Sequence, residues 1–351
     1  MAKRHVHQTH KQKLGQFFTT NSDYILSGYE ELVKDKDVVD PFSGGWDLLS
    51  WAKRSGAKNL FAYDIEPVIE GTVKNDSLKT PPSYKEKFVI SNPPYLAANK
   101  CKTDKSVYAQ WDQDDLYKCH LAGLLANGCS EGLFILPSNF LSESNAKART
   151  MLLRDYTIVS GKYWKEQVFD DATTGICVLH IKKEQREVHE FPLMMYPENV
   201  TVNVTLERRY GYLHGKDFFD YVADVPSYSL VKTDVGMPAP NTRIVVGLLQ
   251  AGKFPFGLSY NEGEPVFCNP KSFTTYQLTL PNLSLTEDQQ RDIVSLFQKK
   301  LKQFQDQYYG MFLANYMGAD QKILSRRYAQ LLFCRVLVDL NIVKNLETFF
   351  V

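Results

Sequence analysis

The stretch DVVDPFSGGWD, residues 37–47, decides the fold class of this chain. It reads as a short β-strand, then a turn of small residues, then a helix over residues 46–54 that ends at Gly56. In an open α/β sheet, such a turn lies at the carboxyl end of a strand, where ligands bind. The stretch lacks both G-x-G-x-x-G spacing and a Walker A lysine, so phosphate binding has little support. A tight turn that needs small residues for steric reasons explains the pattern equally well.

The same alternation of apolar runs and helical patterns continues to about residue 185. It predicts an α/β fold with a doubly wound, mostly parallel, Rossmann-like sheet. The other expected elements are a helix at 115–126 and strands at 60–64, 88–90 and 133–136. Two later strand-like runs, 156–164 and 176–181, are joined by a short link, so we expect an antiparallel hairpin at the edge of the sheet.

The sequence changes character after Lys183, where Pro, Gly, Asn and Tyr become frequent and the alternation stops. We therefore predict a first domain of residues 1–190 and a C-terminal, mixed α/β domain of residues 191–351. In the second domain, Thr286 and Gln289 form a capping-box pattern that starts a helix. A further helix is expected over residues 323–343.

The composition excludes several classes of protein. The 351 residues are 44% hydrophobic and 13% aromatic, which indicates a globular chain. No apolar run is long enough to cross a bilayer and the start lacks a signal-peptide core, so we expect a cytoplasmic protein without membrane association. The six cysteines are scattered without a C-x-x-C pair, which predicts reduced thiols and no metal site.

The net charge of +1 means that any surface for nucleic acid must be local. Each basic cluster taken alone is more often a solvated helix face than a binding site. The candidate clusters are Lys3–Arg4 with Lys11 and Lys13, Arg208–Arg209, Lys299–Lys300 with Lys302, and Arg326–Arg327.

Polar side chains follow the predicted strands at the points where those strands end. Asp40 ends the first strand, Asp64 ends the second, and Asp76 lies in the turn after it. Because the carboxyl ends of neighbouring parallel strands meet at one edge, we expect these groups to lie close together. Asp64 is then placed to bind the ribose hydroxyls of an adenosine, and Asp76 to accept a hydrogen bond from its adenine amine.

The strand at 88–90 leads directly into SNPPY, residues 91–95, the most informative motif in the chain. The Asn92 side-chain oxygen and the Pro93 carbonyl can both accept hydrogen bonds from a planar NH2 group. Proline has a fixed φ and no N–H, and Tyr95 can stack on the ring that carries the amine. A proline-stiffened loop is the alternative for the motif alone, but four polar strand ends in succession favour a binding site.

With these motifs, the chain resembles the S-adenosylmethionine-dependent N6-adenine DNA methyltransferases of the gamma class, found in restriction–modification systems. The order of motifs is similar to the gamma arrangement, and the resemblance covers roughly the first half of the chain. Trp46 departs from it, because many members carry a small residue there. Val168–Phe169 resembles the motif whose Phe packs on a flipped base, although an aromatic residue before a turn is as often part of the core.

The resemblance implies a set of site residues. It implies a catalytic role for Asn92, Pro93, Pro94, Tyr95 and Phe169. It implies contacts to S-adenosylmethionine for Phe18, Thr19, Asp40, Phe42, Ser43, Gly44, Asp64, Ile65, Asp76, Ser77 and Asn92.

The activity implied is site-specific methylation of adenine N6 in double-stranded DNA, with residues 191–351 recognising the target and a cognate restriction endonuclease as a possible partner. Asn-Pro-Pro-Tyr also occurs in methyltransferases that act on RNA or on protein glutamine, because these substrates present a planar NH2 as well. A non-catalytic DNA-binding module is the second alternative. The sequence leaves the oligomeric state and the DNA recognition sequence open.

Overall fold

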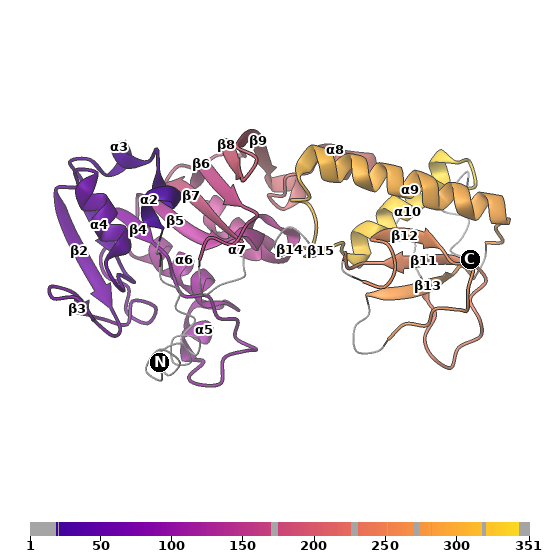
Figure 1. Cartoon of the computed structure of the whole chain (residues 1–351), viewed down its shortest axis with the longest axis horizontal. Helices are drawn as coiled ribbons and strands as arrows, with labels where there is room; N and C mark the ends of the chain where they lie inside the picture. Colours follow the sequence, from indigo (N-terminus) through magenta and orange to yellow (C-terminus); the bar gives the residue numbers. More distant parts are fainter. Residues whose placement is uncertain are drawn as a thin grey trace. The chain divides into compact units, whose positions relative to one another are not determined.

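The computed structural model describes residue 19 and residues 21–169, 175–225, 231–250, 252–269, 274–281, 283–317 and 321–343. The chain divides into two compact units (Figure 1). Unit 1 comprises Met1–Phe140 with Asn145–Tyr212, and unit 2 comprises Leu141–Ser144 with Leu213–Val351.

Unit 1 is built on one nine-stranded sheet in the order β3-β2-β1-β4-β5-β7-β6-β8-β9. The strands are β1 (Asp37–Asp40), β2 (Asn59–Asp64), β3 (Val73–Lys74), β4 (Phe88–Ser91), β5 (Glu131–Pro137), β6 (Thr157–Trp164), β7 (Ile176–Lys182), β8 (Val188–Tyr196) and β9 (Val200–Glu207). Strands β3, β2, β1, β4 and β5 are parallel, and β7 runs antiparallel to both β5 and β6. The predicted α/β class, the strands near each expected position and the antiparallel β6–β7 pair are confirmed. The expectation that this pair forms the edge of the sheet is wrong, because β8 pairs with β6 and β9 follows β8.

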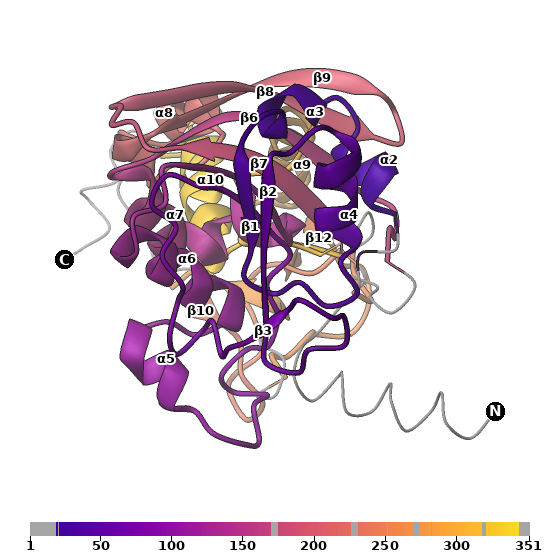
Figure 2. The same ribbon diagram turned by 90° about the vertical axis from the view of Figure 1, so that its left-hand side faces the viewer.

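Helices cover both faces of this sheet. Figure 2 shows α2 and α4 on one face and α6 and α7 on the other. The helices are α2 (Ser22–Leu26), α3 (Glu30–Val33), α4 (Asp47–Arg54), α5 (Ser106–Trp111), α6 (Leu116–Ala126) and α7 (Ala146–Leu153), with short 3-10 turns η1 (Ser138–Leu141), η2 (Glu143–Asn145) and η3 (Arg208–Tyr210). The buried face of α4 contains Leu48, Leu49 and Trp51, and Gly56 follows its end with φ of +88°. The helix predicted from residues 46–54 is therefore confirmed, with its glycine in the left-handed conformation that ends helices.

Strands β8 and β9 extend the sheet of unit 1 beyond the domain boundary that the sequence predicted near residue 190. That boundary falls inside β8, which pairs with β6 and β9, and the two units divide after Tyr212 instead. The apolar residues Phe191, Leu193 and Met195 stand at alternate positions of the sequence, as in a strand with one buried face. All three are buried in β8. Pro192 concealed it, because proline inside a run argues against a strand.

Arg149 on α7 holds the two ends of unit 1 together. Its buried guanidinium donates from Nε to the Tyr212 carbonyl at 2.9 Å and from Nη1 to the Phe140 carbonyl at 2.5 Å. Phe140 and Tyr212 are the last residues of unit 1 before the chain enters unit 2. One side chain therefore fixes both points at which the chain passes from unit 1 to unit 2.

We expect Arg149→Met to lower the free energy of unfolding by about 2–4 kcal/mol, because two buried carbonyls lose their donor. Urea denaturation monitored by circular dichroism measures the change. Arg154→Met is the matched control, since Arg154 is exposed and pairs with Asp155 at the surface. We expect the control to change the free energy of unfolding by less than about 0.5 kcal/mol. Equal effects of the two substitutions would contradict the role of Arg149.

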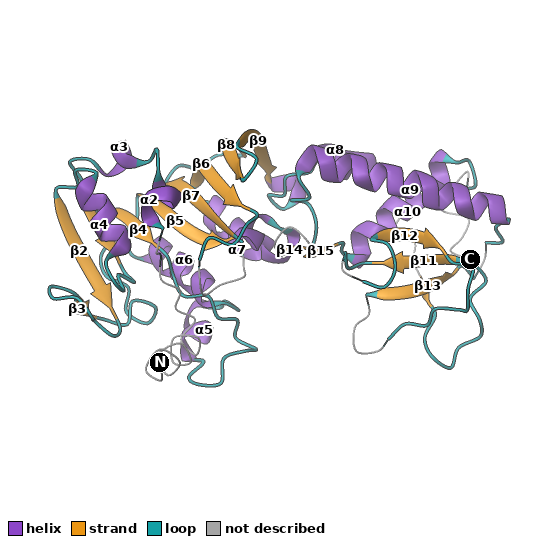
Figure 3. Ribbon diagram, in the orientation of Figure 1, coloured by secondary structure: helices purple, strands orange, loops and turns teal. Residues whose placement is uncertain are grey.

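Unit 2 is a mixed α/β structure (Figure 3). Its antiparallel sheet has the order β10-β13-β11-β12, and β14 pairs with β15. The elements are α8 (Lys216–Tyr221), β10 (Val231–Lys232), β11 (Ile244–Gly247), β12 (Gly257–Tyr260), β13 (Thr275–Thr279), α9 (Glu287–Tyr308), β14 (Asn315–Met317), β15 (Gln321–Ile323) and α10 (Arg326–Asp339). Helix α9 packs against β12 and α10.

The two helices predicted in unit 2 are present, and one of them begins later than expected. The Gln289 N–H donates to the Thr286 hydroxyl and the Thr286 N–H to the Gln289 side chain, so the capping box of α9 is confirmed. The expectation of a helix from residue 323 is wrong at its start. Ile323 belongs to β15, and α10 begins after Ser325, whose hydroxyl accepts from the Tyr328 N–H at 3.1 Å.

Within the described ranges, no helix is both long and apolar enough to span a bilayer.

Candidate functional site

The strand order of unit 1 reverses between β1 and β4. The sheet runs outward from β1 through β2 and β3 on one side and through β4 and β5 on the other. In open α/β sheets, ligands bind where the strand order reverses in this way. Asp40 ends β1 and Asn92 follows β4, so the structure brings these two predicted residues to the ends of neighbouring strands at the reversal point.

The small-residue loop after β1 is fixed to the end of β2 by backbone hydrogen bonds. The Ser43 N–H donates to the Tyr63 carbonyl at 2.9 Å, and the Gly44 N–H donates to Asp64 Oδ2 at 2.9 Å. Trp46 closes the loop with φ of +65°, a left-handed conformation that glycine usually takes. Its indole N–H donates to the Thr72 hydroxyl at 2.7 Å. The bulky side chain at this unusual position thus lies over the neighbouring loop.

Asp64 organises the second strand end through both of its carboxylate oxygens. Oδ2 accepts from Gly44, and Oδ1 accepts from the Glu66 N–H at 2.8 Å. The side chain is 8% exposed, and the next residue, Ile65, presents an apolar side chain that is 40% exposed. Because each carboxylate oxygen can accept more than one hydrogen bond, the Asp64 carboxylate retains capacity for hydroxyl donors.

Asp40 is a buried carboxyl with few donors. It is 1% exposed and accepts the Phe42 N–H at 3.0 Å. Burial raises the pKa of Asp40 from 3.8 to about 8; the Phe42 N–H opposes this rise, and the nearby charges of Asp64 and Asp47 add to it. A carboxyl in such a position gains most from a cationic ligand, since a nearby positive charge favours its ionised form.

A buried hydroxyl in the same loop also lacks a partner. Among the residues that the structure describes, Ser43 Oγ is buried and forms no hydrogen bond. A buried hydroxyl without a partner costs free energy, so Ser43 Oγ favours the presence of a polar ligand group beside the loop.

Asn92 is hydrogen-bonded to one side chain from a distant part of the sequence, Thr19, and to one from its own motif, Tyr95. Its Nδ2 donates to the Thr19 hydroxyl at 3.0 Å. The Tyr95 hydroxyl lies 2.7 Å from Asn92 Oδ1 and 2.8 Å from the Ile135 carbonyl, so its single proton is shared between two acceptors. Thr19 and Asn92 were both predicted to be site residues, and the structure brings them into contact.

The segment after the NPPY motif is clamped by Asp115, which sequence reasoning did not single out. The Leu96 N–H donates to Asp115 Oδ1 at 3.1 Å, and Ala97 forms a β-bridge with Asp115. Burial raises the pKa of Asp115 to about 6, while the Lys118 charge opposes the rise. In the sequence, the position of Asp115 at the start of a helix indicates a capping residue. No sequence signal near Asp115 indicates its contact with Leu96.

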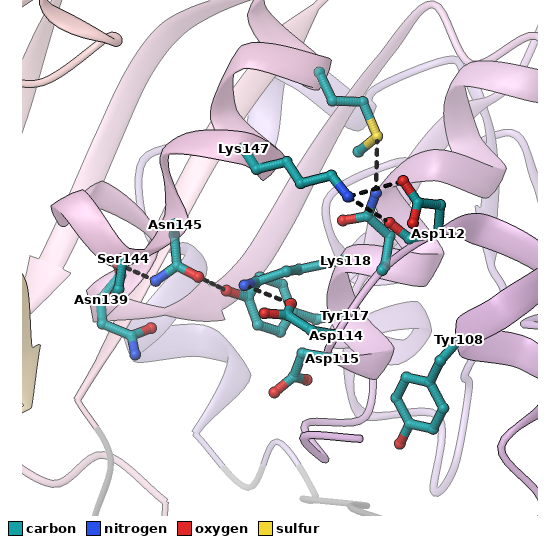
Figure 4. Close-up of polar contacts among 12 residues, drawn as sticks. Tyr108, Asp112, Asp114, Asp115, Tyr117, Lys118, Asn139, Ser144, Asn145 and Lys147 are labelled. Carbon is teal, nitrogen blue, oxygen red and sulfur yellow. Dashed lines mark hydrogen bonds and ion pairs between the residues drawn. The ribbon is translucent and has the colours of Figure 1, made fainter. Parts of the chain in front are cut away.

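Figure 4 shows the polar contacts around the start of α6. Lys118 Nζ pairs with Asp114 Oδ1 at 2.8 Å, and the Tyr117 hydroxyl donates to Asn145 Oδ1 at 2.8 Å. The Tyr117 ring packs edge-on against Tyr95, with centroids 6.1 Å apart. These contacts support the Tyr95 ring from the side of α6.

His120 lies beneath the site and was also missed from sequence. Its Nε2 is hydrogen-bonded to the Ser91 hydroxyl at 3.1 Å, and its ring packs edge-on against Phe42 with centroids 4.8 Å apart. Burial lowers the pKa of His120 to about 3, so the imidazole is neutral. A lone histidine in a helix gives no sequence signal for this packing role.

Asp76 and Ser77 lie in a turn after β3. Asp76 Oδ1 accepts from the N–H groups of Leu78 at 3.2 Å and Lys79 at 3.3 Å, so the side chain caps its own turn. The Ser77 hydroxyl is buried and accepts from Asn75 Nδ2 at 2.9 Å. The Asn75 N–H in turn donates to the Asp64 carbonyl at 2.8 Å, which ties this turn to the end of β2.

Phe169 lies in the core in this structure. It is 2% exposed and belongs to the apolar cluster that includes Ile25 and Trp164. This is the position that the core alternative predicts, and contact between the ring and a base would require the ring to be uncovered. Phe18 lies outside the described residues.

The basic clusters are distributed over both units. Arg208 and Arg209 belong to unit 1, where Arg209 pairs with Glu207 at 2.7 Å and lies over the Tyr210 ring. Lys302 on α9 pairs with Asp306, and Arg326 begins α10 over the Tyr276 ring. The cluster at Lys3–Arg4 with Lys11 and Lys13 lies outside the described residues. In the part of the chain that is described, no group of three or more His, Cys, Asp or Glu residues is arranged to hold a metal ion.

No family model and no curated protein matches the chain. Several solved structures resemble it over part of its length. A modification subunit of a putative type I restriction enzyme from Vibrio vulnificus is 12% identical, with a TM-score of 0.44 over 57% of this chain and 51% of that one. The type IIG restriction endonuclease BpuSI is 14% identical, with a TM-score of 0.40 over 66% of this chain and 36% of that one.

A putative class I S-adenosylmethionine-dependent methyltransferase from Listeria monocytogenes is 14% identical, with a TM-score of 0.41 over 50% of this chain and 65% of that one. In all three cases the chain spans less than two thirds of the structure that it matches. The function of this chain therefore has to be inferred from its own residues.

Proposed function

We propose that this protein transfers a methyl group from S-adenosylmethionine to the exocyclic N6 amine of an adenine in double-stranded DNA. The observation that carries the proposal is the position of Asn92. Its amide contacts Thr19 and Tyr95 at the strand-order reversal, beside the loop that contains Asp40. An amide, a rigid carbonyl and an aromatic ring at the strand ends that carry the buried Asp40 and Asp64 suit a planar amine and a cationic donor.

The residues around the loop fit S-adenosylmethionine. The Asp64 carboxylate would bind the ribose hydroxyls, and Ile65 would lie against the adenine ring. The buried Asp40 carboxyl favours the positive charge of the sulfonium and ammonium groups, and Ser43 Oγ offers a hydrogen bond to the methionine end. Asp76, Ser77, Phe42, Gly44, Thr19 and Phe18 complete the proposed cofactor set. When bound, the sulfonium supplies an activated methyl group.

The NPPY residues would act on the target amine. The adenine amine is a weak nucleophile because its lone pair is delocalised into the ring. Hydrogen bonds from its two N–H groups to Asn92 Oδ1 and the Pro93 carbonyl would favour a tetrahedral nitrogen and the positive charge that develops on it. Pro94 keeps the segment rigid, and Tyr95 provides the ring face on which the base stacks.

An adenine inside a duplex must leave the stack before its amine can enter this site. Stacking on Tyr95 would recover about 1–3 kcal/mol of the unstacking cost. Phe169 could contribute a second face only after its buried ring is exposed. Unit 2, with basic residues such as Arg326, is the proposed target-recognition part, and a restriction endonuclease is a proposed partner.

A filter assay with labelled cofactor tests the substrate class. Duplex DNA, structured RNA and a release-factor protein are each incubated with the wild-type chain and labelled S-adenosylmethionine. We expect label in duplex DNA, as N6-methyladenine, and a steep fall in DNA affinity with added salt. Label in RNA or in glutamine would favour the first alternative from the sequence. DNA binding without any transfer would favour the non-catalytic module.

Asp40 predicts a pH dependence of cofactor binding. Since its pKa is about 8 in the free protein, Asp40 is protonated at pH 6, and a cationic ligand can pair with it only after the proton is released. We therefore expect affinity for S-adenosylmethionine to rise from pH 6 to pH 8, by at most about tenfold per unit, and then to level off. Calorimetry in buffers of different ionisation enthalpy should detect about one proton released per cofactor at pH 6.

The raised pKa of Asp40 also fixes how this group changes folding stability with pH. The unfolded chain loses the Asp40 proton near pH 3.8, whereas the folded chain keeps it to about pH 8, so the same group makes folding less favourable as pH rises through that interval. Asp40→Asn removes the titration and should bind cofactor weakly with no pH dependence between pH 6 and pH 8. A wild-type affinity that is flat across this range, without proton release, would contradict the pairing.

A further inference from the structure

The two edges of the nine-stranded sheet in unit 1 differ in how they are protected. One edge, β3, has two residues, one of which is Lys74. The other edge, β9, has eight residues, and its span from Val200 to Leu206 contains no charge and no proline. Natural proteins usually protect long edge strands with charges, prolines or bulges, because an exposed edge can pair with another chain. The β9 edge has the properties of a pairing surface.

The hydrogen-bonding groups of β9 alternate between β8 and the outside. The Tyr196 carbonyl accepts from the Lys165 N–H, so Tyr196 of β8 faces β6, and by alternation Pro192 also faces β6. Pro192 lies opposite Asn203 in the β8–β9 register. The backbone N–H and carbonyl of Asn203 therefore point away from β8, as do those of Thr201.

Two further observations agree with this direction. The Glu207 carbonyl, four residues beyond Asn203 and thus on the same side, accepts the Tyr212 N–H at 2.9 Å instead of bonding to β8. Among the described residues, the outward backbone groups of Thr201 and Asn203 form no hydrogen bond with another part of the chain. The Asn203 side chain is exposed.

The sequence of β9 is symmetric about Asn203. Residues 200–206 read VTVNVTL, so each residue matches the one equally far on the other side of Asn203, apart from the conservative exchange of Val200 and Leu206. If two copies of β9 pair antiparallel about Asn203, Thr201 lies opposite the second copy's Thr205, and Val202 opposite its Val204. Asn203 then meets itself on the two-fold axis. Threonine pairs and β-branched pairs across strands are favourable.

The segments that flank β9 carry opposite charges. Glu198 precedes the strand and Arg208 follows it, each five residues from Asn203. An antiparallel pair about Asn203 brings the turn that carries Glu198 in one copy near the turn that carries Arg208 in the other, and the symmetry repeats this arrangement at the opposite end. Arg208 is exposed and has no ion pair within the described chain, whereas Glu198 pairs with Lys165 at 2.7 Å.

We propose that β9 is a dimerisation edge: two copies of this chain join their nine-stranded sheets through antiparallel β9 strands related by a two-fold axis at Asn203. The interface is isologous, so each copy contributes the same residues. The two Asn203 residues exchange backbone hydrogen bonds at the centre. This inference is independent of the proposed methyl transfer.

A charge exchange at Asn203 tests the proposal. Because Asn203 faces itself across the axis, Asn203→Lys places two ammonium groups opposite each other, and Asn203→Asp places two carboxylates there. We expect wild-type protein to dimerise reversibly with a dissociation constant on the order of micromolar, as suits a small interface. Each variant alone should weaken the dimer by about 3- to 10-fold, and an equimolar mixture of the two should recover it as a heterodimer.

Sedimentation velocity of the full chain between about 1 and 100 μM measures these constants over the range set by the expected affinity. Asn59→Lys is the matched control, since it adds the same charge at the exposed start of β2 and should dimerise like wild type. Recovery in the mixture requires both variants to be folded, so misfolding cannot imitate it. Wild-type protein that stays monomeric throughout, wild-type association of Asn203→Lys, or a mixture that stays monomeric would each overturn the proposal.

Discussion

Replacing Asn92 with alanine is expected to reduce methyl transfer by about 100- to 1000-fold while leaving the affinity for S-adenosylmethionine within about twofold of wild type. Asn92 Oδ1 is the acceptor proposed to hold the target amine, and its removal takes away stabilisation that is needed chiefly when charge develops on the nitrogen. Single-turnover kinetics with labelled cofactor and duplex DNA measure the rate. Calorimetry measures cofactor affinity separately.

The companion variant Tyr95→Phe separates orientation from stacking. It keeps the ring but removes the hydroxyl that contacts Asn92 Oδ1 and the Ile135 carbonyl. We expect an intermediate loss in the rate, since Asn92 Oδ1 then loses its contact with the Tyr95 hydroxyl while Nδ2 keeps its hydrogen bond to Thr19. The control is Asn59→Ala at the other end of the sheet, whose amide donates to Asp37 at 2.7 Å and should not affect turnover. A wild-type rate for Asn92→Ala would refute the proposed mechanism.

Replacing Asp64 with alanine is expected to weaken S-adenosylmethionine binding by at least about 100-fold, through the loss of charge-assisted hydrogen bonds to the two ribose hydroxyls. The structure adds a second reason. Asp64 also accepts the N–H groups of Gly44 and Glu66, so its loss loosens the loop that follows β1. Isothermal titration calorimetry measures the affinity, and circular dichroism reports whether the fold is retained.

Asp37→Ala provides the matched control for Asp64. Asp37 begins β1, at the opposite end of the strand from Asp40, and accepts a hydrogen bond from Asn59. It should leave cofactor affinity unchanged. Equal weakening by both substitutions would indicate general destabilisation, and unchanged affinity in Asp64→Ala would exclude Asp64 from the cofactor site.

Several elements of both units were predictable because their signals are local. The strand at residues 37–40, the helix that ends before Gly56 and the capping box at Thr286 each depend on residues within a few positions of one another. Where sequence reasoning failed, a local signal was misleading. Pro192 concealed β8, and the apolar pattern near Ile323 belonged to β15 rather than to the start of α10.

For the candidate site too, the residue types were predictable from the sequence and their contacts were not. The sequence by itself determined which chemical groups stand at the strand ends: the Asp40 and Asp64 carboxylates, the Asn92 amide and the Tyr95 ring. Residue type and period alone carry this information. The sequence could not supply their partners, because Thr19 contacts Asn92 from 73 residues away and Asp115 contacts Leu96 from 19 residues away.

Only the tertiary structure decided the strand order and the burial that raises the pKa of Asp40. The same holds for the hydrogen bonds of Arg149 to the Phe140 and Tyr212 carbonyls and for the position of β9 at the edge of the sheet. Each of these depends on which distant segments exclude water together, a property of the packed chain and not of any short stretch. Hydrogen-bonding direction along β9 is the clearest example. It follows from the hydrogen bond between Tyr196 at the end of β8 and Lys165 just after β6, and no pattern within residues 200–207 specifies it.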